Sequence, residues 1–232
     1  HALTLKGEKR LADGYAFSAN YTLSTSRDDA SSPGPTEAEA NMPQDVRNLD
    51  AEQGRSSFDH RHVLVGSGTY ELPLLRNATG WQRAVGGDWR VNAIVTLQSG
   101  APFTVNLGTD NANIGAGPAQ RPNVSGDPNL SSNRTPERWF DTGAFSLPAP
   151  FTFGNSTRNR VVGPGVANVD ASLQKEWVLE NGTRLEFRWE VFNLLNHANF
   201  DLPNRISFTP NFGRIFSAKN PREMQFGLRL VF

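Results

Sequence analysis

Residues 222–232, at the end of the chain, read REMQFGLRLVF. Apolar side chains occupy every second position of this stretch, namely Met224, Phe226, Leu228, Leu230 and Phe232. The positions between them hold Glu223, Gln225, Gly227, Arg229 and Val231. Because successive side chains of a β-strand point to opposite sides of a sheet, this pattern predicts a strand with one wholly apolar face.

Strand-like alternation recurs upstream, in segments 2–10, 15–24, 60–72, 88–98, 168–177 and 183–193. In segment 60–72 apolar residues fall on both faces, so its facing stays open. In segment 183–193 one face is apolar, with Leu185, Phe187, Trp189 and Val191. The opposite face carries Arg184, Glu186, Arg188 and Glu190.

The connections between these segments alternate in length. Tight turns are predicted at 12–14 and at 180–182, where Asn181-Gly182 suits the positive φ angles of a hairpin turn. Residues 73–87 form a medium connection, and the long ones span 25–59, 99–167 and 194–221. Bacterial outer-membrane barrels have short periplasmic turns and longer extracellular loops. The order predicts an all-β fold, an antiparallel transmembrane β-barrel section of about seven strands with long extracellular loops.

Composition argues against several other classes of protein. No apolar run approaches the roughly 20 residues of a membrane helix, and a mean hydropathy of −0.49 suits a barrel, whose lipid-facing and lumen-facing residues alternate. The 23 basic and 23 acidic side chains leave no net charge that would favour a nucleic-acid partner. The absence of cysteine excludes disulfides and thiolate metal sites.

The chain begins at His1 in mid-pattern, without an initiating Met or a signal peptide. About seven strands do not close a barrel in this register, and an open edge in lipid leaves backbone groups unsatisfied. We therefore expect residues 1–232 to be the carboxyl-terminal portion of a larger barrel, whose other strands precede His1.

Four stretches carry a resemblance to a known family. They are WRVNAIVTLQSGAPFTV at 89–105, FGNSTRNRVVGPGVANVDASLQKEW at 153–177, LEFRWEVFNLLNHANFDLPN at 185–204 and FGRIFSAKNPREMQFGLRLVF at 212–232. Together they resemble the barrel of TonB-dependent outer-membrane receptors, in the Oar-like branch that carries an amino-terminal carboxypeptidase-regulatory-like domain. The resemblance implies a barrel of about 22 strands. It also implies a plug, absent from this sequence, on which the periplasmic TonB system acts.

The resemblance further implies an assembly role for the last strand. Barrel-assembly machinery recognises the final strand of such proteins, and here the signal would consist of Phe226, Leu228, Leu230 and Phe232. The expected partners are this machinery, outer-membrane lipid, the TonB system through the missing plug, and an unidentified ligand.

The charged row of segment 183–193 is the candidate for ligand contact in the lumen. Such rows more often pair with neighbouring strands or with a plug. Glu186 and Glu190 would lie roughly 13 Å apart on a strand, too far for a paired general acid and base. We therefore expect no catalytic residues and no enzyme activity.

Metal binding also has only weak support. His60 and His62 share a strand face but lack a third ligand at recognisable spacing. Asp110, Asn111 and Asn113 resemble part of a calcium loop, yet Asx turns explain them more simply. No metal and no cofactor are expected.

Two lysines test the assignment of the faces. Lys9 and Lys175 fall on the apolar face, where a cation at the bilayer midplane costs about 2–4 kcal/mol. Both lie near the short turns, so we expect them to snorkel to the headgroups. Aromatic residues should form an interfacial girdle at the same end, and they are Tyr15, Trp89, Trp177 and Phe232.

Three functions compete. The first is the wall of a TonB-dependent receptor that takes up a scarce ligand such as a glycan fragment, a siderophore or a peptide. The second is a surface binding or adhesion barrel without energised transport. The third is a soluble β-sandwich lectin or hydrolase, whose apolar faces would have to meet across a core.

Overall fold

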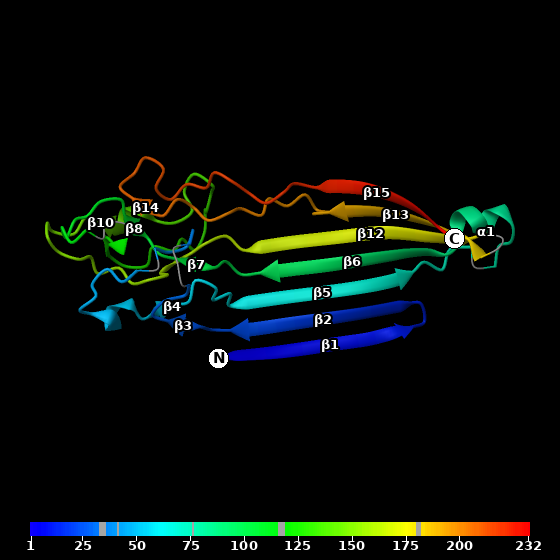
Figure 1. Ribbon diagram of the computed structural model, residues 1–232, viewed down its shortest axis with the longest axis horizontal. Coiled ribbons are helices and arrows are strands. Elements are labelled where there is room, and N and C mark those ends of the chain that lie inside the picture. The colour runs from blue at the N-terminus through cyan, green and yellow to red at the C-terminus, as the bar shows by residue number, and fades with distance from the viewer. Residues whose placement is uncertain (33–35, 41, 76, 116–118, 180–181) are drawn as a thin grey trace.

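The computed structural model describes residues 1–32, 36–40, 42–75, 77–115, 119–179 and 182–232. In these ranges one antiparallel sheet has seven strands: β1 (Ala2–Ala12), β2 (Tyr15–Ser24), β5 (His62–Glu71), β6 (Trp89–Gln98), β12 (Val166–Val178), β13 (Arg184–Phe192) and β15 (Glu223–Val231). The strands pair in chain order and lie side by side (Figure 1). The predicted all-β antiparallel architecture is confirmed. Strands β1 and β15 form the two edges, so the described sheet is not closed.

The strand ends differ slightly from the prediction. β12 begins at Val166 instead of 168, because its pairing with β6 runs without a break from Val166 to Lys175. The first tight turn lies at Asp13 and Gly14, with φ angles of 56° and 81°. The second was predicted at 180–182, of which 180–181 lie outside the described residues.

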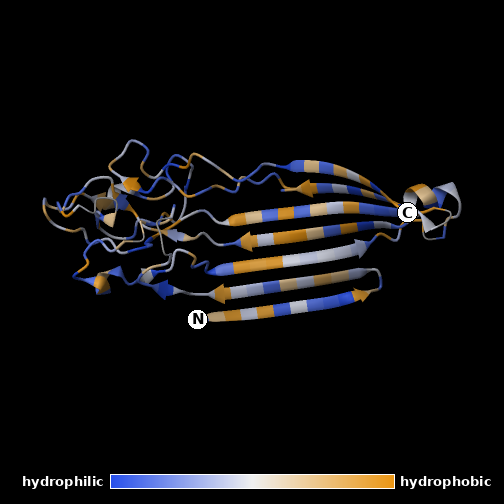
Figure 2. Cartoon of the chain, viewed as in Figure 1, coloured by the Kyte–Doolittle hydropathy of each residue, from blue (hydrophilic) through white to orange (hydrophobic). Residues whose placement is uncertain are grey.

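The register gives the sheet two different faces, since directly paired residues share a face. Polar and apolar residues alternate along most strands (Figure 2). The apolar face is continuous across all seven strands and includes Leu5, Phe17, Tyr21, Leu64, Tyr70, Val91, Leu97, Leu173, Phe187, Trp189, Phe226 and Leu228. The open facing of residues 60–72 is thereby settled, with Leu64 and Tyr70 on the apolar face and Val63 and Val65 on the polar face.

The apolar face has no hydrophobic core beneath it. Phe226 and Leu228 are 70% and 71% exposed, and Leu5 is 57% exposed. Among the described residues, Val191 is the only hydrophobic side chain of the seven-stranded sheet that is buried. A soluble sandwich would cover this face, so that alternative is wrong for the part of the chain described. A contiguous exposed apolar surface of this size is typical of a membrane contact.

A short helix, α1 (Trp81–Gly86), interrupts the medium connection and was not predicted. It lies at the end of the sheet where the chain terminates (Figure 1). Two tryptophans of the apolar face hold it, because Trp177 Nε1 donates to the Ala84 carbonyl at 2.6 Å and Trp89 Nε1 to the Val85 carbonyl at 3.0 Å. No helix in the described ranges is long and apolar enough to cross a membrane.

Lys175 departs from the expected snorkelling. Its side chain is buried against the α1 connection, where Nζ donates to the carbonyl oxygens of Gly87 and Arg83. The ammonium group also lies over the rings of Trp89 and Trp177, at 5.4 and 5.3 Å from their centroids. Backbone dipoles and aromatic rings therefore stabilise this charge in place of headgroups.

Lys9, by contrast, reaches toward the neighbouring turn. Its Nζ donates to the Ala12 carbonyl at 2.9 Å and lies 3.2 Å from the centroid of the Tyr15 ring. The side chain thus extends to the end of the strand, in the direction that snorkelling requires.

The described residues of the three long connections are folded together into one unit, which we call the cap (25–32, 36–40, 42–61, 99–115, 119–165 and 193–222). It lies at the end of the sheet opposite α1 (Figure 1). It contains η1 (Leu49–Glu52), η3 (Thr142–Ala144) and the short strand pairs β3 (Arg27–Asp28) with β4 (Gly54–Arg55), β7 (Pro102–Phe103) with β11 (Val161–Val162), β8 (Asn106–Leu107) with β14 (Ile206–Ser207) and β9 (Asn123–Val124) with β10 (Phe145–Ser146). Its hydrophobic core centres on Phe140, which makes edge-on contacts with Phe103, Phe145 and Phe212.

A pair of neighbouring positions on β13 tests the two faces. Phe187→Arg places a cation on the apolar face and is expected to destabilise a membrane-inserted barrel by up to about 2–4 kcal/mol. It also removes the edge-on contact with Trp89. Arg188→Gln, on the polar face, should leave stability unchanged. Urea titration of the barrel in lipid vesicles measures both, and an equal loss in the two variants would mean that the register is off by one residue.

Candidate functional site

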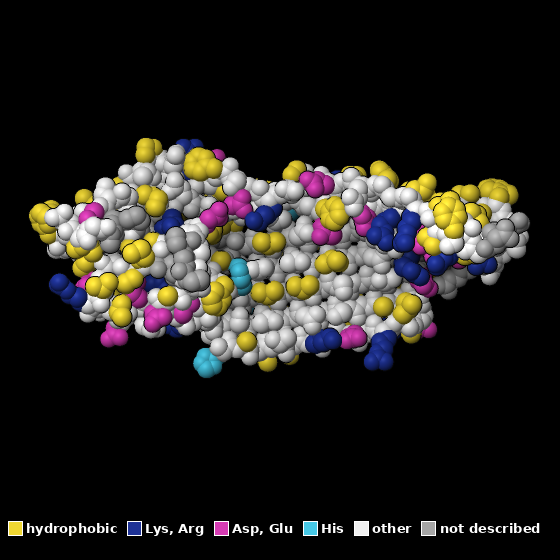
Figure 3. Space-filling model, viewed as in Figure 1, with side chains coloured by type: hydrophobic (Ala, Val, Ile, Leu, Met, Phe, Trp, Pro, Cys, Tyr) yellow, Lys and Arg dark blue, Asp and Glu magenta, His cyan; other side chains and the backbone are white. Residues whose placement is uncertain are grey.

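The polar face of the sheet carries the four residues predicted to face the lumen. Figure 3 views the sheet from this face, where charged side chains gather toward the α1 end. Arg184 lies 3.9 Å from Glu176 on β12, and Glu186 lies 3.8 Å from Arg229 on β15. The row is thus paired with both neighbouring strands.

The other two members of the row also have partners. Arg188 lies 3.5 Å from Glu190 on its own strand, and Gln225 of β15 donates to the second carboxylate oxygen of Glu190. These side chains remain partly solvated, and such exposed pairs contribute little to stability. Their formal charges balance locally, so the surface suits a polar partner of mixed charge.

Uncharged side chains continue the polar face toward the cap. Thr69 donates to Asn92 Oδ1 at 2.8 Å, and Asn92 Nδ2 donates to Ser172 Oγ at 3.1 Å. This hydrogen-bonded line crosses β5, β6 and β12. A hollow of about 730 Å³ lies beside it over the charged row, lined by residues that include Arg90, Gln174, Glu186, Arg188 and Arg229. The face is therefore a polar wall, with hydrogen-bond donors and acceptors beside an open hollow.

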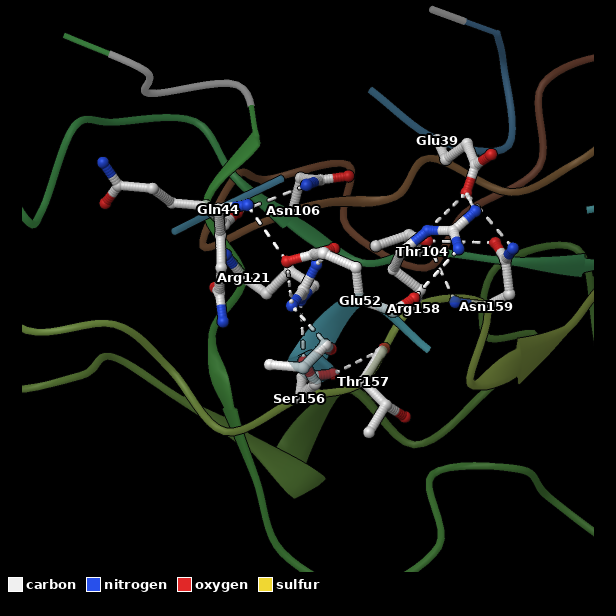
Figure 4. A network of polar contacts seen from close by, with 12 residues as sticks. Glu39, Gln44, Glu52, Thr104, Asn106, Arg121, Ser156, Thr157, Arg158 and Asn159 are labelled. Carbon is white, nitrogen blue, oxygen red and sulfur yellow. Dashed lines mark hydrogen bonds and ion pairs between the residues drawn. The ribbon is translucent and has the colours of Figure 1, made fainter. Parts of the chain in front are cut away.

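The cap is organised by buried ion pairs (Figure 4). The first joins Arg121 to Glu52 through two nitrogen–oxygen contacts of 2.6 and 3.0 Å, and both side chains are almost completely buried. Arg121 Nε also donates to the Ser156 carbonyl at 2.8 Å, while the Gln44 backbone N–H donates to Glu52 Oε1. The guanidinium and the carboxylate are thus satisfied by several partners, as a buried pair requires.

The second buried pair joins Arg158 to Glu39. Arg158 Nη2 lies 2.6 Å from Glu39 Oε2, and Arg158 Nη1 donates to Asp28 Oδ1 at 3.1 Å and to the Glu52 carbonyl at 3.0 Å. Asn159 Nδ2 donates to the same Glu39 oxygen at 3.2 Å. One guanidinium therefore holds three points of the first long connection.

The third long connection joins the cap through Arg205. This side chain donates to the backbone carbonyls of Glu37 and Thr36 and to Asn106 Oδ1. Residues 206–207 also pair in parallel with residues 106–107. Segments far apart in the sequence thus form a single folded platform at one end of the sheet.

The sequence did not reveal this network. Arg121 and Arg158 lie in stretches rich in Gly, Pro and Asn that were read as loops. One feature of the sequence could have indicated buried charges. A few arginines stand within otherwise uncharged stretches, as in GNSTRNRVVG at 154–163. Their buried carboxylate partners are between 69 and 119 residues away, and such pairings cannot be inferred from local pattern.

The residues considered as metal ligands, Asp110, His60 and His62, make ordinary structural contacts. The Asp110 carboxylate accepts the backbone N–H groups of Ile114 and Gly115 at 3.0 and 2.6 Å, and these bonds hold the pKa of Asp110 below its usual value. His62 Nδ1 is hydrogen-bonded to the Tyr21 hydroxyl at 2.8 Å, and His60 Nδ1 to the Ser99 carbonyl. Within the described residues, no group of three or more His, Cys, Asp or Glu side chains is placed to hold a metal ion.

Removing one partner of a buried pair tests the cap network. Arg121→Met leaves the Glu52 carboxylate buried without its counter-ion, and we expect the cap to lose about 3–5 kcal/mol. Arg138→Met breaks an exposed pair with Asp141 in the same cap, which should cost no more than about 1 kcal/mol. Protease digestion of the cap in intact membranes should be accelerated by the first substitution alone. Equal rates for the two variants would show that the buried pair does not hold the cap together.

Comparison with known proteins agrees with this architecture. The family model described as an outer membrane beta barrel domain matches residues 1–225. No curated protein and no solved structure matches the chain. Because the family match covers nearly the whole chain, the protein belongs to the outer membrane β-barrel domain family, and its two-faced sheet is a section of barrel wall in the bacterial outer membrane.

Proposed function

We propose that the chain is part of the wall of a TonB-dependent receptor, which takes up a scarce ligand such as a glycan fragment, a siderophore or a peptide. The observation that supports this most is the polar face, a hydrated surface with balanced charges that runs along the sheet. A wall of this kind suits contact with a plug or a passing solute. Further strands would complete the barrel, because a free edge in lipid leaves backbone groups unsatisfied.

Within this proposal the chain acts without catalysis or a cofactor. Glu186 and Arg188 would contact the plug or the ligand from the barrel wall, and the TonB system would supply energy through the plug. The cap would lie outside the cell, with the short turn at Asp13 in the periplasm.

The second function is surface binding without energised transport. It is favoured by the cap itself, whose own hydrophobic core and buried ion pairs make it a rigid platform. Long loops that fold in this way can present a fixed surface to a partner. The two functions differ in whether access to the lumen changes when the cell is energised.

We also propose that the final strand carries the signal for barrel assembly, formed by Phe226, Leu228, Leu230 and Phe232. All four side chains are exposed on the apolar side or at the end of the strand, and Phe232 is 96% exposed. They are thus accessible to an assembly partner before the barrel closes.

Cysteine labelling of the complete receptor distinguishes transport from adhesion. Residues 1–232 contain no cysteine, so single cysteines can be introduced there into a receptor that is otherwise free of cysteine. The variants are Gln174→Cys on the polar face, Ser31→Cys in the cap and Asp13→Cys in the short turn. With a membrane-impermeant maleimide on intact cells, Ser31→Cys should react and Asp13→Cys should not. Gln174→Cys should react faster in energised cells than after a protonophore or in cells lacking TonB, because movement of the plug exposes the lumen.

Two results would contradict these proposals separately. A Gln174→Cys rate that does not depend on energy would favour the adhesion barrel. Labelling of Asp13→Cys in place of Ser31→Cys would invert the orientation, whatever the function.

Deletion of Phe232 tests the assembly signal. We expect the truncated receptor to accumulate in the periplasm and to be degraded, with little heat-modifiable barrel in the outer membrane. Tyr15→Ala is the control, since Tyr15 is an exposed aromatic residue at the same end of the sheet. Normal insertion of the truncated receptor, or an equal defect in the control, would reduce Phe232 to an ordinary member of the interfacial girdle.

A further inference from the structure

A cavity of about 670 Å³ lies where the cap meets the sheet. One side of it is formed by a cross-strand row of the apolar face, which consists of Tyr21, Leu64, Leu97 and Ala167. The other side comes from the cap, with Trp139 and Phe200 among its residues. Because the row belongs to the apolar face, the cavity lies on the lipid side of the barrel wall and away from the lumen.

The cap side of the cavity is held firmly in place. Trp139 Nε1 donates to the Val162 carbonyl at 2.9 Å, and its backbone N–H donates to the Gly213 carbonyl. The backbone N–H of Ala167 donates to Asn199 Oδ1 at 2.7 Å, which ties the start of β12 to the segment carrying Phe200. The cavity is therefore built into the fold.

The lining is mostly apolar and aromatic. The Tyr21 hydroxyl and His62 Nδ1 satisfy each other at 2.8 Å, with their rings stacked at 6.2 Å between centroids. Neither of these groups therefore needs a polar ligand. Apolar pockets of a few hundred Å³ are the usual sites for small hydrophobic ligands.

We propose that this cavity binds an acyl chain of an outer-leaflet lipid. The row that forms its wall continues directly into the exposed apolar face, which meets hydrocarbon in an outer-membrane barrel. A lipid chain can thus enter from the bilayer without crossing water, while its polar end stays near the rim. The inference that a lipid chain occupies the cavity rests only on the exposed apolar face. The assignment to the outer leaflet rests on the orientation of the barrel given under the proposed function. Neither depends on transport.

Photocrosslinking in vesicles tests the site on the complete barrel. The vesicles contain phosphatidylcholine, part of which carries a diazirine midway along one acyl chain, and mass spectrometry locates the labelled residues. We expect label on Trp139 and Phe200 as well as on Leu173, which lies on the open apolar face. Ala167→Trp fills the cavity and should lower the label on Trp139 and Phe200 by about tenfold. Label on Leu173 should persist.

Ala171→Trp is the matched control, since it adds the same side chain to the same face of the same strand outside the cavity. It should leave the label on Trp139 unchanged. Ala198→Trp fills the cavity from the cap side, so the test survives if Ala167→Trp does not assemble.

Three outcomes would overturn the proposal. The first is label on Leu173 but none on Trp139 and Phe200. The second is unchanged label on Trp139 in both cavity-filling variants, which would indicate general lipid contact. The third is label on Trp139 in purified barrels but not in native outer-membrane fragments, which would mean that another molecule occupies the cavity.

Discussion

Backbone hydrogen bonding in a medium without water is the constraint on which the rest of this structure depends. Inside a bilayer, each N–H and C=O must find a partner on a neighbouring strand. The strands between β1 and β15 satisfy this condition by pairing on both sides in chain order, with nearly unbroken ladders. Unbroken pairing also fixes the faces, because a slip of one residue would turn the apolar side chains inward. The sheet can therefore do without a core, and its large side chains stay exposed for lipid.

The cap is held together by buried side chains and not by long backbone ladders. It has only short ladders, so it is held together by a compact aromatic cluster around Phe140 and by the buried pairs of Arg121 and Arg158. The charged row on the polar face of the sheet is paired but solvated, whereas Arg121 and Arg158 in the cap are buried and surrounded by acceptors. The same residue types thus have different roles at the two ends of the molecule. On the sheet they form a hydrated surface, and in the cap they join distant segments.

The sheet and the cap meet at the ends of β5, β6 and β12. The features of functional interest lie on opposite faces of the sheet. In our proposal, the polar face with Glu186 and Arg188 faces the lumen and the transport pathway. The cavity beside Tyr21 and Trp139 belongs to the lipid side. At the other end of the sheet, α1 covers Lys175, whose charge would otherwise face hydrocarbon. On the apolar face, Lys175 and the hydrogen-bonded pair of Tyr21 and His62 are thus matched by local partners.

The sequence by itself determined the sheet, because a period of two in residues such as Phe226 and Leu228 is a local property that survives any arrangement of the strands. Alternating connection lengths likewise determined the antiparallel order. The alternation of apolar residues could not decide which face of segment 60–72 meets lipid, because apolar residues occur on both faces. Only the pairing with β2 and β6 assigns each residue to a face. Nor could the alternation reveal α1, the burial of Lys175 or the pairs of Glu52 with Arg121 and Glu39 with Arg158. Those features depend on contacts between residues far apart in the chain, so only the tertiary structure decides them.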